Sequence, residues 1–142
     1  MTERPKEVLV IPCSGVGKVH GLISRESAYL AVDELAPTAA AVVCLALLVR
    51  EDEETLERIR ALPCITIDGC AKTCARTNVE IAGGRVAQAV QVAKALGNHR
   101  GIQPGNGSEL TEDGWAVTRE IAESVAEGVE RICAGEEGSD GA

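Results

Sequence analysis

The sequence predicts a single-domain α/β fold: a three-layer, Rossmann-like open sheet of about four mostly parallel strands, with helices on both faces. Two observations predict it. Short β-branched apolar runs alternate with segments of helical periodicity, which is the pattern of parallel strands joined by right-handed crossovers. The core must also be aliphatic, because 45% of the residues are hydrophobic but there is no Phe, one Trp and one Tyr. Small aliphatic side chains suit a sheet that is covered on both faces.

The first half of the chain predicts two strands and two helices. The first strand is an apolar run that stops at Pro12. The first helix has apolar residues at core-facing spacing, begins at the following glycines or later at Ser24 as N-cap, and ends before Pro37. The second strand contains no polar residue, which favours burial on both faces. The second helix opens with acidic residues and closes with arginines before Pro63, matching the helix dipole. These elements span residues 6–11, 16–35, 39–48 and 51–61.

The second half predicts two further strands and two helices. The third strand ends at Asp68-Gly69, a pair typical of tight turns. The helix after it stops at a Gly-Gly pair. A fourth strand is followed by a loop that contains Pro-Gly-Asn-Gly, and the last helix is amphipathic. The strands span residues 64–67 and 86–92, the helices 72–81 and 112–133, and the loop 98–113. We expect residues 1–134 to form the domain and residues 135–142 to form a flexible acidic tail.

Charge and composition exclude several classes of partner. The formal net charge is -8, whereas binding to nucleic acid or to an anionic membrane requires clustered Lys and Arg. The longest apolar run, residues 39–49, is shorter than the ~20 residues that span a bilayer as a helix. The N-terminus lacks the apolar region of a signal peptide. We therefore expect a cytoplasmic protein whose six cysteines bind metal or do chemistry more often than they form disulfides.

Four of these cysteines are predicted to lie at one edge of the sheet. Cys13 follows the first strand, Cys44 is late in the second, and Cys70 follows the third. Cys74 lies one turn further along, so Cys70 and Cys74 would share one helical face at i and i+4. Ligands in open α/β sheets bind at the carboxyl ends of the strands. Four thiolates at that place predict a metal ion as partner, either Zn²⁺ or the iron of an iron-sulfur cluster.

The remaining cysteines have a structural interpretation. Cys64 begins the third strand and therefore belongs to the opposite edge of the sheet, and Cys133 ends the last helix. Cys44 also has this alternative, since free cysteines in apolar strands are often core residues. Asp68 either caps the following helix by accepting backbone N–H groups or acts as a catalytic acid.

Two other functional interpretations stay open. A thiol activated by a helix N-terminus and by nearby cations would make Cys70 the reactive group of a sulfur-handling or redox enzyme or carrier. The glycine-containing residues 15–18 lack the spacing of a Walker A loop. A nucleotide or small anion can nevertheless bind at a helix N-terminus in that position.

The cysteine motifs resemble those of the DGC-domain family, which is named for its Asp-Gly-Cys sequence. The resemblance rests on Cys13-Ser14-Gly15, Cys44, Asp68-Gly69-Cys70 and Cys74, and it extends from about Val8 into the final helix. Members of that family are described as zinc-binding on the strength of four chelating cysteines. The resemblance implies that Cys13, Cys44, Cys70 and Cys74 hold the metal here.

Overall fold

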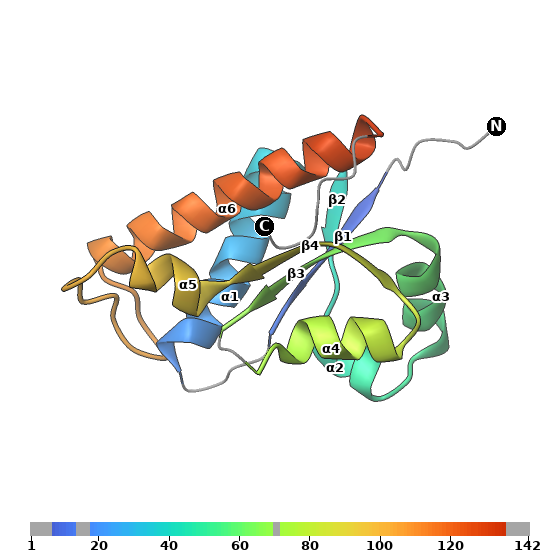
Figure 1. The fold of residues 1–142 in the computed structure, drawn as a ribbon, viewed down its shortest axis with the longest axis horizontal. Helices are drawn as coiled ribbons and strands as arrows, with labels where there is room; N and C mark the ends of the chain where they lie inside the picture. Colours follow the sequence, from blue (N-terminus) through green and yellow to red (C-terminus); the bar gives the residue numbers. More distant parts are fainter. Residues whose placement is uncertain (1–6, 14–17, 70–71, 136–142) are drawn as a thin grey trace.

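A computed structural model describes residues 7–13, 18–69 and 72–135 of the protein. Within these residues, four parallel strands form one sheet in the order β2-β1-β3-β4. Helices cover both of its faces (Figure 1), which confirms the predicted α/β class. The strands are β1 (Val8–Pro12), β2 (Ala40–Val42), β3 (Pro63–Asp68) and β4 (Arg85–Gln91).

The helices are divided between the two faces of the sheet. One face packs against α1, its π-helical continuation η1 and α6, and the other packs against α2, α3 and α4 (Figure 1). A short helix, α5, follows β4. The bounds are α1 (Val19–Leu30), η1 (Ala31–Leu35), α2 (Leu45–Val49), α3 (Glu53–Ala61), α4 (Cys74–Ile81), α5 (Val92–Gly97) and α6 (Glu112–Cys133). None of the described helices is both long enough and apolar enough to cross a bilayer.

Strand β1 is buried along its whole length and contributes to two separate cores. Val8 and Val10 face α1 and α6, whereas Leu9 and Ile11 face α2, α3 and α4, as the period of two along a strand requires. Each fully buried side chain of this kind contributes roughly 2 kcal/mol relative to an exposed one. β1 pairs with β3 up to Pro12, so both strands end at the same edge of the sheet.

The last helix agrees closely with its prediction. α6 spans the predicted residues, and its apolar stripe is buried against the sheet and α1. The stripe consists of Val117, Ile121, Val125, Val129 and Ile132. Thr111 caps the helix by accepting the N–H of Gly114. The acidic tail predicted for residues 135–142 lies outside the described residues from position 136 onward.

The prediction of one long second strand is wrong. The strand β2 is limited to Ala40–Val42, and the following apolar residues form the helix α2. Leu45 and Leu48, one helical turn apart, are buried in the core that includes α4. A continuous apolar run fits a buried strand and a buried helix equally well, so the packing partner decides between them. The same chain segment therefore turns away from the sheet at Cys44.

Candidate metal centre

Three of the four predicted cysteines lie just beyond the carboxyl ends of adjacent strands. Cys13 directly follows β1, Cys44 follows β2 by two residues as the N-cap of α2, and Cys74 is the first residue of α4 after β3. Cys70 lies outside the described residues. The described cysteines are all free thiols.

Cys13 is held tightly at the end of β1. Its side chain is 8% exposed, and its backbone N–H is shared between the carbonyl of Ile67 at 2.8 Å and the hydroxyl of Ser24 at 3.1 Å. Its Sγ accepts the backbone N–H of Gly69, with an N···S distance of 3.1 Å. A hydrogen bond donated to sulfur stabilises the thiolate, which is the form that binds metal.

Ser24 connects the three segments around Cys13. Ser24 lies in the middle of α1 and is fully buried. Its hydroxyl donates to the carbonyl of Ile67 at 2.8 Å and accepts the N–H of Cys13. The interpretation of Ser24 as a late N-cap is therefore wrong, because the helix begins at Val19. A serine at a core-facing position of an apolar helix was the sequence signal for this role, since buried hydroxyls require partners.

The side chain of Asp68, at the end of β3, caps the first turn of α4 from outside the helix. Its carboxylate accepts the N–H groups of Ala75 at 2.7 Å and Arg76 at 3.1 Å, which satisfies two of the helix's unpaired donors. Asp68 is 2% exposed, and burial raises the pKa of its carboxyl group although both hydrogen bonds and the charge of Arg76 oppose that rise. Of the two interpretations of Asp68, the structure supports the capping role.

Gly69 lies in a closely packed position. A Cβ atom at this position would lie 3.1 Å from Cβ of His20 and 3.3 Å from Sγ of Cys13, closer than most side chains tolerate. The absence of a side chain lets the backbone of Gly69 approach the sulfur closely enough to donate its N–H. The Asp-Gly pair thus has two separate tasks, one toward α4 and one toward Cys13.

The prediction that Cys70 and Cys74 share one helical face is wrong. α4 begins at Cys74, its N-cap Thr73 has a left-handed backbone with φ of 48°, and Lys72 is in a turn. The helix therefore starts too late for an i and i+4 relation between the two cysteines. Asp68 favours this start, because its side chain accepts N–H groups of the first turn of α4.

Cys13 and Cys44 line one cavity of about 310 Å³ at the carboxyl ends of β1 and β2. Arg25 and Tyr29, from α1, line it as well. These two residues are four positions apart and so share a helical face, and this spacing is the sequence signal for their common position. The cavity therefore combines two thiols with a guanidinium group and an aromatic ring.

The described cysteines do not form one coordination sphere. No group of three potential ligands among His, Cys, Asp and Glu comes together within the described residues, and the side chain of Cys74 is exposed. The fit to a thiolate-bound metal thus rests on Cys13 and Cys44, which share a cavity. It also rests on Gly69, the neighbour of Cys70 in the chain, which contacts the sulfur of Cys13.

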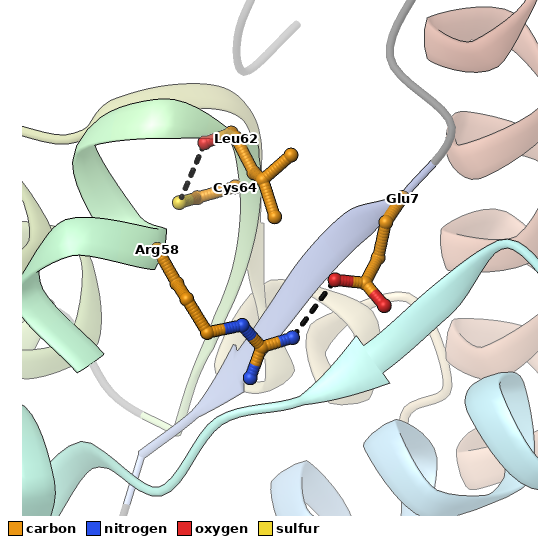
Figure 2. Close-up of polar contacts among 4 residues, drawn as sticks. All are labelled: Glu7, Arg58, Leu62 and Cys64. Atoms are coloured by element: carbon orange, nitrogen blue, oxygen red, sulfur yellow. Dashed lines mark hydrogen bonds and ion pairs between the residues drawn. The ribbon is translucent and has the colours of Figure 1, made fainter. Parts of the chain in front are cut away.

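Cys64 lies near the start of β3, at the opposite end of the strands from Cys13, and has a different environment. Its thiol is fully buried and donates to the carbonyls of Leu62 at 3.5 Å (Figure 2) and Ile59 at 3.8 Å. Burial raises the pKa of this thiol to about 12, opposed by the charge of Arg85. Burial also raises the pKa of Cys133, at the end of α6. These environments agree with the structural interpretation of both residues.

The segment that contains the four candidate cysteines matches a known protein family. The chain matches the family described as the DGC domain over residues 9–121. The protein belongs to the DGC-domain family. The match includes Cys13, Cys44, Cys70 and Cys74, so the DGC domain contains the complete candidate site and ends within α6. No curated protein and no solved structure matches the chain.

Proposed function

We propose that this DGC-domain protein binds one zinc ion through the thiolates of Cys13, Cys44, Cys70 and Cys74. The observation that carries the proposal is the contact between the N–H of Gly69 and the sulfur of Cys13. This contact joins the end of β3 to the end of β1, next to the cavity that Cys13 shares with Cys44. Cys70 follows Gly69 directly, and successive Cα atoms are only about 3.8 Å apart.

Four thiolates suit zinc for electrostatic and geometric reasons. Structural zinc sites are tetrahedral and closed, with Zn–S distances of about 2.3 Å. The N–H of Gly69 offsets part of the negative charge that the Cys13 thiolate brings. Cys74 and Cys70 would complete the set, so metal binding would draw the start of α4 toward β1 and β2. Such a site adds its binding free energy to the stability of the fold, and its thiolates persist in a reducing compartment such as the cytoplasm.

The test is metal analysis of the full chain purified without oxygen. We expect about one equivalent of zinc per chain, and we expect separate Ser substitutions at Cys13, Cys44, Cys70 and Cys74 each to lower it strongly. Cys133→Ser is the matched control, because Cys133 lies at the far end of α6, and it should retain the metal. A protein with neither zinc nor iron near one equivalent contradicts the proposal.

The same experiment separates the two alternatives from the zinc proposal. Iron in equal amount with acid-labile sulfide, together with visible absorption, would identify an iron-sulfur cluster on the same ligands. A metal-free protein in which Cys70 alone is alkylated rapidly at neutral pH would identify a reactive thiol of low pKa instead.

A further inference from the structure

A second cavity, of about 420 Å³, lies along the edge strand β4. Four consecutive residues, 88–91, line it together with residues of α5 and α6 and with Arg76 of α4. Because side chains alternate between the faces of a strand, four consecutive lining residues show that the cavity follows the outer edge of β4. Within the described chain, no strand pairs with that edge. The volume falls in the range of small-molecule pockets.

The cavity is positively charged on a protein that is negatively charged overall. Arg76, Lys94 and Arg131 line it from three different helices, although the formal net charge of the chain is -8. Arg76 forms an ion pair with Glu80 at 3.8 Å. In the described part of the chain, neither Lys94 nor Arg131 takes part in an ion pair. The one carboxylate among the described lining residues, Glu120, lies 2.7 Å from Nε2 of His99. Three cationic side chains therefore line one cavity of a protein whose composition predicts a mainly acidic surface.

Neutral polar groups complete the lining. The amide of Gln88 donates to the hydroxyl of Ser124 at 3.5 Å, and its Oε1 is buried without a hydrogen-bond partner. A Cβ atom at Gly128 would overlap with that oxygen, so glycine at this position of α6 makes the room that the Gln88 side chain occupies. Between β4 and α6 the cavity is therefore lined by a polar side chain, Gln88, that packs closely against Ser124 and Gly128.

We propose that this cavity binds a small organic anion with at least two negative charges, carried on phosphate or carboxylate groups. Lys94 and Arg131 provide charge-assisted hydrogen bonds from the α5 and α6 side, and Arg76 provides them from the α4 side. Ala89, Val90 and Ile121 contact the carbon skeleton of the ligand. The site is separate from the zinc proposal, since none of the described cysteines lines the cavity, and separate from the glycine-containing residues 15–18.

The test is a titration of the full-length, ¹⁵N-labelled protein with inorganic phosphate and, separately, with succinate at constant ionic strength, followed by NMR. We expect saturable shifts of amide signals from β4 and α5. Lys94→Gln and Arg131→Gln should each raise the Kd about tenfold, because each removes one charge-assisted hydrogen bond. Arg119→Gln is the matched control: this arginine is exposed on α6 but does not line the cavity, so its Kd should be unchanged.

The outcomes distinguish the ligand chemistry from non-specific binding. Saturation by phosphate but not succinate assigns the site to phosphate esters, and the reverse assigns it to dicarboxylates. The shifts should persist in Cys13→Ser, which separates this site from the metal centre. No saturable shift with either anion at tens of millimolar, or an equal loss of affinity in Arg119→Gln, overturns the proposal. Lys94, Arg119 and Arg131 are exposed, so their substitution should leave the fold intact, and a preserved spectrum verifies the fold of every variant, Cys13→Ser included.

Discussion

Cys13 and Cys64 are buried cysteines that belong to neighbouring chain segments, the end of β1 and the start of β3, and their sulfur atoms make opposite hydrogen bonds. Both belong to the core between the sheet and α2, α3 and α4. Cys64, near the start of β3, donates its S–H to two backbone carbonyls. Cys13, directly after β1, accepts an N–H from Gly69. The two thiols are chemically identical in the unfolded chain, so the surrounding backbone creates the difference.

The direction of the hydrogen bond distinguishes the two buried cysteines and supports the proposed role of Cys13 as a metal ligand. Carbonyl oxygens stabilise the neutral thiol and repel the thiolate, whereas an amide N–H stabilises the thiolate. Burial does not separate the two residues, since both are at most 8% exposed. The ends of parallel strands supply the difference, because the backbone leaves the sheet there and its N–H groups become available to a neighbouring side chain.

Alkylation should show the largest contrast, between the buried Cys64 and the exposed Cys44. With a pKa of about 12, roughly one Cys64 side chain in ten thousand is a thiolate at pH 8. We expect Cys64 in the metal-free folded protein to react with iodoacetamide at least about 1000-fold more slowly than the exposed Cys44. Its rate should still be rising at pH 10, since its pKa lies above that value. Mass spectrometry of digests measures both rates, and comparable rates would refute the environment described for Cys64.

The next largest contrast should be in zinc retention, between substitutions of Cys13 and of Cys64. We expect Cys13→Ser to lower the bound zinc at least about tenfold and Cys64→Ala to leave it unchanged. A chelator should then lower the Tm of the wild-type protein and of Cys64→Ala, but not that of Cys13→Ser, which has no metal to lose. Equal zinc loss in the two variants would mean that the hydrogen-bond direction does not identify the ligand.

Ser24 tests whether the support of Cys13 matters for the site. Ser24→Ala removes the hydroxyl that holds the N–H of Cys13 and the carbonyl of Ile67. The expected costs are about 1 kcal/mol of unfolding free energy and several-fold in zinc affinity. The matched control is Ser27→Ala, because Ser27 is also buried in α1 but has one long hydrogen bond of 3.4 Å. It should change the zinc affinity little, and an equal loss in both variants would contradict this role.

Gly69 should show the smallest effect. In Gly69→Ala the new methyl group would lie against Cys13 and His20, which should cost about 1 kcal/mol of unfolding free energy. Gly97→Ala at the end of α5 is the control, because a Cβ there would meet no described atom within 4 Å. Chemical denaturation of both variants measures the difference. Unchanged stability in Gly69→Ala would show that the neighbours of Gly69 move apart easily.

Local patterns in the sequence predicted the fold class and much of the element order. The helix α6 has its predicted bounds, Cys13 follows a strand as predicted, and Asp68 caps α4 as one of its interpretations held. Hydrophobic periodicity, glycines, prolines and capping residues act over a few neighbouring positions, so one sequence is sufficient to read them. For the same reason, the sequence position of Cys64 at the start of β3 was sufficient to place it at the amino ends of the strands, away from Cys13.

Only the tertiary structure decided the rest. It divided the apolar residues 39–48 between a strand and a helix, because the packing partner of Leu45 and Leu48 lies elsewhere in the chain. It moved the start of α4 to Cys74 through the reach of the Asp68 side chain. It also set the character of the Cys13 sulfur through a backbone N–H that is 56 residues away in sequence. Such contacts depend on how distant segments meet in the folded chain, which no local pattern encodes.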